Sequence, residues 1–128
     1  MTRILIADDS PQVRSVLRHL VEQDASWEVC AEAIDGQEAV QRTRESHPDL
    51  VLLDFQMPVM DGLQAAREIA KVAPAIPVLL CSAHLSAILI GEARRIGIMG
   101  AVPKSNASSI VNGIRALLRH ESFFCQPA

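Results

Sequence analysis

The chain has 128 residues, of which 49% are hydrophobic and 21% are charged, and its formal net charge at pH 7 is −3. This length suits one domain with a core of ordinary size, and this composition excludes both a disordered chain and a membrane-spanning one. The negative balance gives no support for nucleic-acid binding by this chain, because binding to a phosphate backbone needs a basic face.

The N-terminal part contains two predicted pairs of strand and helix. Residues 4–7 form a short apolar strand, which is too short to be the apolar region of a secretory signal peptide, so we expect a cytoplasmic protein. Ser10 and Pro11 open the first helix as its N-cap and its first helical residue, and this helix should end near residue 23. A second strand follows over residues 27–31, and after the turn at Asp35-Gly36 a second helix should end before His47-Pro48. The predicted buried stripe of the first helix consists of Val13, Val16, Leu17, Leu20 and Val21.

The central strand is the apolar run over residues 50–53, whose continuity is typical of a strand buried on both faces in a parallel sheet. A helix is expected over residues 63–72, and the fourth strand covers residues 76–81. The helix over residues 86–96 contains three consecutive large apolar residues, which cannot all face one core, so at least one should be exposed. The inward residues of the helix over 63–72 should be Leu63, Ala66, Ile69 and Ala70.

The last predicted pair is a short strand over residues 101–103 and a helix over residues 108–119, with Asn106 or Ser108 as its cap. The three cysteines, Cys30, Cys81 and Cys125, lie far apart without a C-x-x-C pair. This spacing argues against a zinc site and against a disulfide framework, so we expect reduced thiols.

Four of the predicted strands are followed by polar side chains. The first ends in Asp8-Asp9 and the central one in Asp54, and because parallel strands end at the same edge of a sheet, these three carboxylates should converge. Clustered anions raise each other's pKa unless a cation offsets the repulsion, and carboxylate oxygens suit Mg²⁺. The sequence therefore predicts a Mg²⁺ site at this edge.

Ser82 follows the fourth strand and Lys104 follows the last one, so a hydroxyl and a positive charge should face the same crevice. Together with the carboxylates they describe a phosphoryl site. In such a site a carboxylate attacks phosphorus, cations neutralise the phosphoryl oxygens, and the hydroxyl binds one of these oxygens after transfer.

This ordered set resembles the receiver domain of two-component response regulators. The residues that carry the resemblance are Asp8-Asp9, Asp54, Met57-Pro58, Asp61-Gly62, Ser82-Ala83 and Lys104. The resemblance covers nearly the whole chain and implies a doubly wound α/β fold with a five-stranded parallel sheet, in the order 2-1-3-4-5, and five helices. We expect the receiver to occupy residues 1–120, with residues 121–128 as a tail or the start of a linker.

The resemblance also implies roles for the site residues. Asp54 would accept phosphate from a sensor histidine kinase, Ser82 would be the switch hydroxyl, and Lys104 would pair with the phosphate. The implied Mg²⁺ ligands are Asp9, Asp54 and the backbone carbonyl of Gln56, with Asp8 acting through water. The module would not be an enzyme beyond its own phosphorylation and dephosphorylation.

Two departures from the family pattern point to a subfamily. Many receivers carry an aromatic residue three positions before the lysine, where this chain has Ala101, and a proline after the lysine, where it has Ser105. A lysine without that proline resembles the receivers joined to LuxR-type helix-turn-helix domains. DNA would then be bound only through a domain that is absent from this chain.

Several alternatives remain open. The chain could be a free-standing receiver that acts by protein contacts, and its apolar helix over residues 86–96 is either a tolerated surface or part of a partner or dimer face. A haloacid-dehalogenase-like phosphatase would need Asp-x-Asp where this chain has Asp54-Phe55-Gln56. A purely structural domain would leave the convergent polar residues unexplained.

Overall fold

Strands and helices alternate along the chain, in the order that the apolar runs predict. The computed structural model describes residues 1–127. The strands are β1 (Thr2–Ala7), β2 (Trp27–Ala33), β3 (Leu50–Asp54), β4 (Val78–Ser82), β5 (Gly100–Pro103) and β6 (Phe123–Phe124). The helices are α1 (Pro11–Glu22), α2 (Gly36–Ser46), α3 (Gly62–Val72), α4 (Ala87–Arg95) and α5 (Ala107–Leu118).

The strands form one parallel sheet in the order β2-β1-β3-β4-β5-β6. The predicted doubly wound α/β fold, with its order 2-1-3-4-5 and five helices, is confirmed, with the correction that the sheet has six strands. The additional strand, β6, pairs with β5 through residues 123 and 124, beyond the domain boundary predicted at residue 120. Two residues are too few to show a strand period, which is why sequence patterns did not predict β6.

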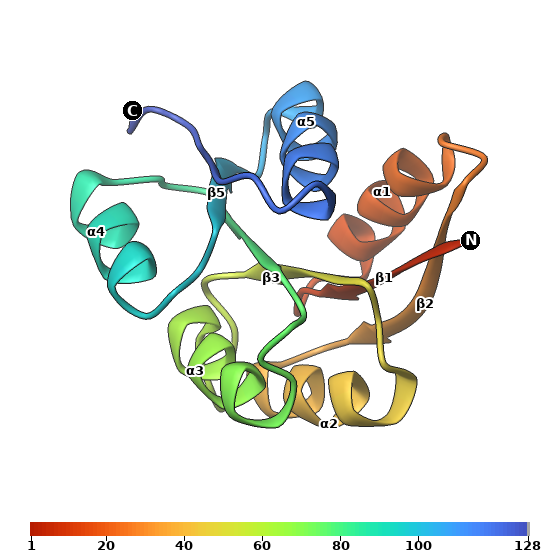
Figure 1. The fold of residues 1–128 in the computed structure, drawn as a ribbon, viewed down its shortest axis with the longest axis horizontal. Coiled ribbons are helices and arrows are strands. Elements are labelled where there is room, and N and C mark those ends of the chain that lie inside the picture. Colours follow the sequence, from red (N-terminus) through yellow and green to blue (C-terminus); the bar gives the residue numbers. More distant parts are fainter. Residues whose placement is uncertain (128) are drawn as a thin grey trace.

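Helices cover both faces of the sheet (Figure 1). α1 and α5 pack on one face, and α2, α3 and α4 pack on the other. Alternate residues of β3 enter the two layers: Leu50 and Leu52 join the α1 and α5 side, whereas Val51 and Leu53 join the opposite side. Burial on both faces explains why β3 is an uninterrupted apolar run.

Each helix begins at a residue whose side chain accepts a hydrogen bond from the main-chain N–H three positions further on. Asn106, and not Ser108, caps α5. For α3 the cap is reciprocal, because the side chain of Gln64 also accepts from the N–H of Asp61. The five N-caps are Ser10, Asp35, Asp61, Ser86 and Asn106.

Two residues that the sequence placed on buried helix stripes are exposed in the structure. Val16 is 66% exposed, and Ala70 is exposed while Ala65 is fully buried. Val16 is adjacent to the buried Leu17, and Ala70 is adjacent to the buried Ile69. Because neighbouring helical residues lie about 100° apart, each exposed residue falls outside the buried arc.

The expected exposure on α4 is confirmed, since Ile88 is 78% exposed whereas Leu89 is buried. Within residues 1–127, no helix is both long and apolar enough to cross a membrane.

Candidate functional site

The carboxyl ends of four strands meet at one edge of the sheet, and the predicted site residues lie there. Asp8 and Asp9 follow β1, Asp54 ends β3, Ser82 ends β4, and Lys104 follows β5. Main-chain hydrogen bonds keep these ends in register: the N–H of Lys104 donates to the carbonyl of Ser82 at 2.9 Å. The sheet therefore brings all five residues to one edge.

Three carboxylates form an acidic cluster at this edge. Asp8, Asp9 and Asp54 each place a carboxylate oxygen within 4.8 Å of the other two. Asp8 and Asp54 are buried, and Asp9 is exposed. The cluster is thus open to solvent on the side of Asp9 and enclosed by protein on the side of the other two.

Lys104 joins the two buried carboxylates. Its Nζ lies 3.0 Å from Oδ2 of Asp8 and 3.0 Å from Oδ1 of Asp54. Burial alone would lower the pKa of this ammonium, but the two carboxylates outweigh that effect and raise the pKa of Lys104. The lysine therefore stays charged at neutral pH and compensates part of the negative charge.

The carboxyl group of Asp54 has an unusual environment. Burial raises its pKa from 3.8 to about 6; the ammonium of Lys104 opposes this rise, and the carboxylate of Asp8 adds to it. The other oxygen, Oδ2 of Asp54, is buried without a hydrogen-bond partner among the described residues. A buried carboxylate oxygen without a partner is costly, so this atom marks a place where a further group would be stabilised.

The cluster has the donor set of a hard divalent cation. With all three carboxylates ionised, the single positive charge of Lys104 leaves a net charge of −2 at this edge. Carboxylate oxygens that face an exposed opening suit an ion that retains several waters. The aspartate cluster can therefore hold a metal ion.

The hydroxyl of Ser82 forms two hydrogen bonds with the main chain of His84, two residues further along the same loop. Its Oγ donates to the carbonyl of His84 at 2.8 Å and accepts from the N–H of His84 at 3.2 Å. Ser82 is buried at the end of β4, while His84 is exposed. The structure thus brings Ser82 to the predicted edge, with its hydroxyl engaged in a local turn.

The loop between β3 and α3 packs tightly against the end of β3. Gln56 is exposed in this loop, two residues after Asp54. A Cβ atom on Gly62 would lie 2.5 Å from the carbonyl oxygen of Asp54, closer than real contacts allow, so only glycine fits there. The N–H of Gly62 also donates to the carbonyl of Phe55 at 2.7 Å. Asp61 and Gly62 therefore fix the backbone immediately after Asp54.

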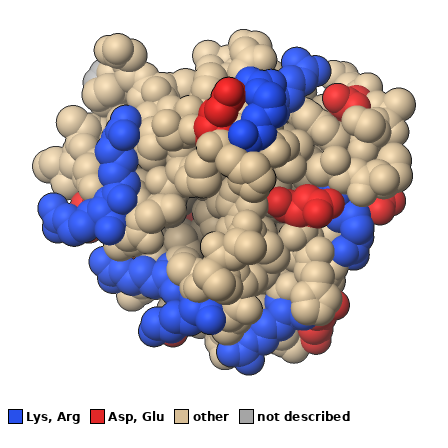
Figure 2. Space-filling model, in the orientation of Figure 1, with Lys and Arg blue, Asp and Glu red and all other residues tan. Residues whose placement is uncertain are grey.

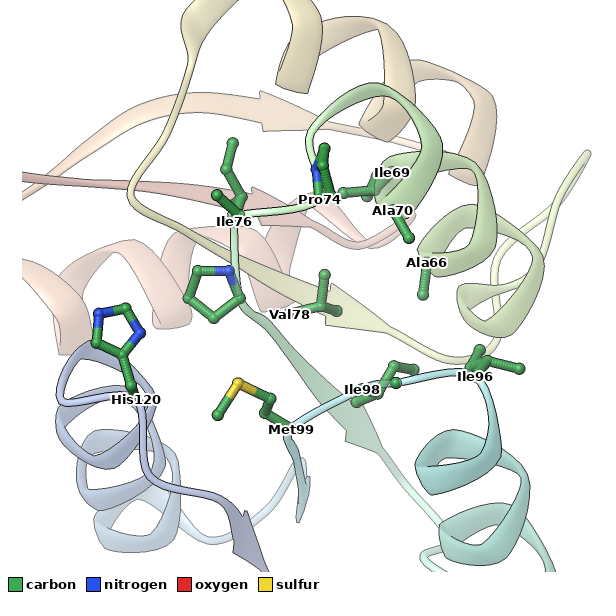
Figure 3. Close-up of a pocket in the computed structure, with 13 residues that line it drawn as sticks. Ala66, Ile69, Ala70, Pro74, Ile76, Val78, Ile96, Ile98, Met99 and His120 are labelled. Atoms are coloured by element: carbon green, nitrogen blue, oxygen red, sulfur yellow. The ribbon is translucent and has the colours of Figure 1, made fainter.

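A second hollow lies at the opposite edge of the sheet, near the amino ends of β4 and β5 (Figure 3). Its volume is about 100 Å³, and apart from His120 its lining side chains are apolar. Figure 3 shows Ile76, Val78, Ile98 and Met99 around it. This hollow contains no group comparable to the acidic cluster, so the chemistry is concentrated at the carboxyl edge.

Comparison with known proteins gives the same assignment. A family model described as "Response regulator receiver domain" matches residues 4–115. The chain belongs to the response regulator receiver domain family. The order of strands and the acidic edge of this receiver were expected from the sequence, and the predicted family is confirmed.

Two curated relatives and one solved structure show how far the similarity extends. The receiver is 38% identical to the chemotaxis protein CheY of Thermotoga maritima, over 74% of this chain and 78% of that protein. It is 39% identical to a protein-glutamate methylesterase/protein-glutamine glutaminase of Pyrococcus abyssi, over 86% of this chain and 30% of that protein. The chain thus spans about a third of the length of its methylesterase relatives.

The structural similarity includes the predicted subfamily. A two-component response regulator of the LuxR family from Aurantimonas sp. SI85-9A1 superposes with a TM-score of 0.92 at 34% identity, covering 96% of this chain and 89% of that one. The resemblance to LuxR-type receivers, based on the residues around Lys104, agrees with this neighbour. The chain is a receiver of the two-component response regulator type.

Sequence reasoning missed one polar side chain beside the site. The guanidinium of Arg14, in α1, donates to the carbonyl oxygen of Asp8 at 2.8 Å. In the sequence, Arg14 and Arg18 show only that one side of α1 is basic. Their shared partner, Glu32, lies in β2 and could not be assigned without the fold.

Proposed function

We propose that this receiver accepts a phosphoryl group on Asp54 from a sensor histidine kinase and relays it as a conformational change. The observation that carries the proposal is the buried Oδ2 of Asp54, which has no hydrogen-bond partner among residues 1–127 and belongs to a carboxyl group paired with Lys104. The neighbouring carboxylates of Asp8 and Asp9 complete a site for a cation and a phosphoryl group. A purely structural domain would not require three carboxylates and a lysine at one edge of the sheet.

The proposed transfer is a simple displacement at phosphorus. A carboxylate oxygen of Asp54 attacks the phosphorus of a phosphohistidine, the P–N bond breaks, and the imidazole nitrogen keeps the electron pair. Lys104 offsets negative charge on the phosphoryl oxygens. When bound, Mg²⁺ would supply further neutralisation of that charge. We propose Asp9, Asp54 and the carbonyl of Gln56 as its direct ligands, with Asp8 acting through water.

Ser82 is the proposed switch residue. To bind a phosphoryl oxygen, its hydroxyl must give up the hydrogen bond to the carbonyl of His84. The net value of such a bond is about 1 kcal/mol, so a phosphoryl oxygen can compete for the hydroxyl. Phosphorylation would then favour a packing in which the loop at His84 and the adjacent α4 have shifted.

The phosphodonor is proposed to dock next to Lys104. A groove of about 390 Å³ runs from α1 to the loop after β5, and it adjoins the phosphoacceptor edge. Its apolar lining suits a helical surface of a kinase that presents a histidine. The lining residues are Gln12, Val13, Val16, Leu17, Ala83, Lys104 and Ser105.

The output is proposed to lie outside this chain. The LuxR-family neighbour supports a transcription regulator whose DNA-binding domain is absent from this chain. In Figure 2 basic side chains follow one another along the left and lower margin of this face, and acidic side chains lie mainly toward its top and right. The formal net charge of −3 gives no support for nucleic-acid binding by this chain. The alternative is a free-standing receiver that acts by protein contacts. A homodimer formed on phosphorylation is compatible with both.

We propose no enzymatic turnover on an external substrate. A phosphatase with an aspartyl intermediate would need an acid two residues after the nucleophile, and this position is Gln56. Steady hydrolysis of a phosphate ester by the purified chain would contradict this part of the proposal. The three free cysteines fit the proposed location in the reducing cytoplasm.

The deciding experiment is intact mass spectrometry after incubation with acetyl phosphate, with and without Mg²⁺. We expect a single labile phosphate that requires Mg²⁺ and is absent from Asp54→Asn. Size exclusion of a beryllofluoride-treated sample would report dimer formation in parallel. Stoichiometric labelling of Asp54→Asn would place the acceptor elsewhere. Absence of both labelling and Mg²⁺ binding in the unmodified chain would refute the phosphoacceptor function.

A further inference from the structure

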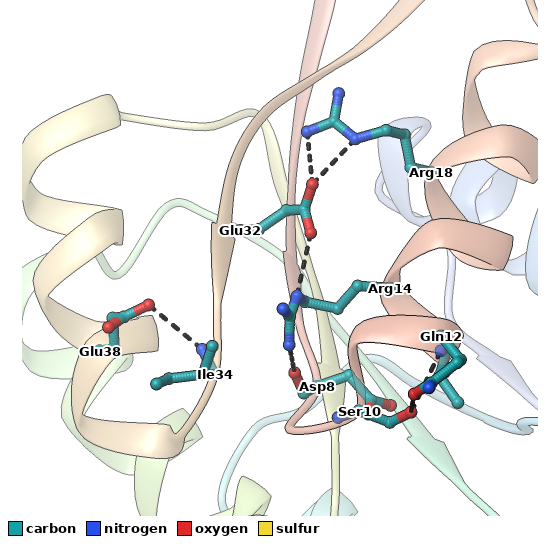
Figure 4. Close-up of polar contacts among 9 residues, drawn as sticks. Asp8, Ser10, Gln12, Arg14, Arg18, Glu32, Ile34 and Glu38 are labelled. Carbon is teal, nitrogen blue, oxygen red and sulfur yellow. Dashed lines mark hydrogen bonds and ion pairs between the residues drawn. The ribbon is translucent and has the colours of Figure 1, made fainter.

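A chain of polar contacts connects β2 and α1 to the acidic cluster (Figure 4). Glu32, in β2, accepts from Nε of Arg14 at 3.0 Å and from Nε of Arg18 at 2.8 Å. A terminal nitrogen of the Arg14 guanidinium donates to the carbonyl oxygen of Asp8 at 2.8 Å. The side chain of Arg14 is only 16% exposed, whereas that of Arg18 is 42% exposed. Arg14 is therefore the enclosed member of the pair, and it alone reaches Asp8.

An irregularity in β2 places Glu32 on the correct face of the sheet. The pairing of β1 with β2 shifts between Ile4 and Leu5, so that one residue of β2, Cys30, has no partner. Cys30 and Ala31 consequently both pack toward α2 and α3. Such a bulge re-aims the side chains that follow it. Here it turns Glu32 toward α1, where both arginines can reach it.

Three hydrogen bonds and one ion pair surround Asp8. Its N–H donates to the carbonyl of Ala33 at 3.0 Å, and its Oδ1 accepts from the N–H of Ser10 at 2.9 Å. Its Oδ2 pairs with Lys104, and its carbonyl oxygen accepts from Arg14. Because Asp9 follows directly and is exposed, its position depends on how firmly the backbone of Asp8 is held.

We infer that Arg14, held in place by Glu32, is a positioning residue for the Asp8-Asp9 segment and thereby sets the affinity of the acidic cluster for Mg²⁺. The inference rests on the proposed function, since it concerns the proposed Mg²⁺ site. Groups that hold metal ligands in place affect metal affinity although they do not touch the ion. Without Arg14 the carbonyl of the buried Asp8 loses its partner, and the segment is free to move away from Asp54.

The charge of Arg14 would by itself oppose cation binding. Glu32 counters this, because its carboxylate lies between the two guanidinium groups and forms an ion pair with each. Burial would raise the pKa of Glu32, but Arg18 and Arg14 outweigh that effect and lower it, so Glu32 remains ionised at neutral pH. The pairing lets a cationic side chain support the metal site with little electrostatic cost.

The test compares Arg14→Ala with Arg18→Ala, because both arginines bind Glu32 and only Arg14 contacts Asp8. Calorimetric titration with MgCl₂ at constant ionic strength measures the Kd for Mg²⁺. We expect this Kd to rise about tenfold in Arg14→Ala. In Arg18→Ala it should stay within about twofold of the unmodified value. Arg14→Lys keeps the charge but reaches one partner only, so its Kd should fall between the two.

A second readout needs no metal. Amide hydrogen exchange of Asp8 and Ser10 in the Mg²⁺-free chain should be faster in Arg14→Ala than in Arg18→Ala, because both amides belong to the segment that Arg14 holds. A Kd in Arg14→Ala equal to or below the unmodified value would overturn the inference, and so would unchanged exchange. If the unmodified chain binds no Mg²⁺, the proposed function fails, while the exchange measurement still decides whether Arg14 holds Asp8.

Discussion

Asp54 combines two properties that oppose each other. Burial favours its protonated form, yet the proposed role as a nucleophile requires the ionised form, and the ammonium of Lys104 favours ionisation near neutral pH. The folded chain therefore keeps a carboxylate in a place where an uncharged side chain would be more stable. Such a conflict between stability and local chemistry is typical of a functional residue.

This conflict predicts that Asp54→Asn is more stable than the unmodified chain at neutral pH without Mg²⁺. The folded-state pKa of about 6 lies above the ordinary 3.8, so this group favours folding most below pH 3.8, and the contribution is lost as the pH rises through 6. The free energy of unfolding should rise by up to about 3 kcal/mol at pH 7.5. Chemical denaturation at several pH values measures the free energy of unfolding of both chains. The difference between Asp54→Asn and the unmodified chain should vanish below about pH 4.

Asp9→Asn is the matched control, because Asp9 belongs to the same cluster but is exposed. Its effect on the free energy of unfolding should stay below about 1 kcal/mol, as for most exposed charges. Mg²⁺ should narrow the difference between Asp54→Asn and the unmodified chain, since an ion that binds only the folded form stabilises it. If Asp54→Asn were less stable than the unmodified chain at every pH, burial of the ionised Asp54 would not be destabilising, and the prediction would be wrong.

Sequence reasoning located individual site residues better than it described their contacts. Polar residues directly after apolar strands indicate a shared edge, which is why Asp54, Ser82 and Lys104 could be grouped. Strand ends do not reveal that Ser82 binds the carbonyl of His84. Nor do they reveal that Val59 adopts a φ of 70°, a conformation that β-branched residues rarely take. These details depend on how neighbouring loops pack.

At the scale of the helices, α1 and α4 each present one large exposed aliphatic residue. Val16 lines the groove next to Lys104, whereas Ile88 projects from α4 and does not line that groove. Helical periodicity wrongly placed Val16 in the core, although it correctly required an exposed residue among Ile88, Leu89 and Ile90. Helical periodicity predicts reliably which residues lie at the centre of a helix's buried face. It predicts poorly which residues lie at the margins of that face, because its width depends on how the helix packs against the sheet.

The groove predicts a selective effect of Val16→Asp. An added negative charge in the apolar lining should slow phosphoryl transfer from a histidine kinase about tenfold or more, because a desolvated contact is replaced by a charge. Labelling by acetyl phosphate should be unchanged, since this small donor needs no docking surface. Initial rates of transfer from a phosphorylated kinase, compared with rates from acetyl phosphate, measure the effect.

Ile88→Asp provides the matched control, because Ile88 is also an exposed aliphatic residue and lies on another helix. It should leave both rates unchanged and weaken any dimer detected by size exclusion after beryllofluoride treatment. Equal loss of transfer in the two variants, or loss of labelling by acetyl phosphate in Val16→Asp, would argue against docking at this groove.

The whole molecule follows from alternation of short apolar runs with amphipathic helices, a pattern that few topologies satisfy. Sequence alone could therefore predict the parallel sheet and its five helices. It could not predict β6, whose position depends on long-range contacts. Phe124 pairs beside Ala101, and the guanidinium of Arg94 lies 4.0 Å from the centre of its ring. The segment after α5 thus joins β5 to α4.

This arrangement predicts a contribution of the C-terminal segment to the stability of the whole fold. The double variant Phe123→Ala with Phe124→Ala should lower the free energy of unfolding by about 2–4 kcal/mol, because two half-buried rings lose their contacts. Ser122→Ala with Gln126→Ala, both at exposed positions, is the control and should change it by less than about 0.5 kcal/mol. Urea denaturation followed by circular dichroism measures both. Equal stability of the two double variants would show that β6 packs only weakly.

β6 has a further consequence for how the receiver behaves at high concentration. The N–H of Phe123 donates to the carbonyl of Met99, and the N–H of Cys125 donates to the carbonyl of Ala101, so the outer side of β5 is already occupied. An open strand edge is a template on which other chains can add strands and aggregate. A strand of two residues closes that edge and offers little length for further pairing. The segment after α5 therefore protects the β5 edge of the sheet from strand addition, and any shortened form of the chain should retain it through Cys125.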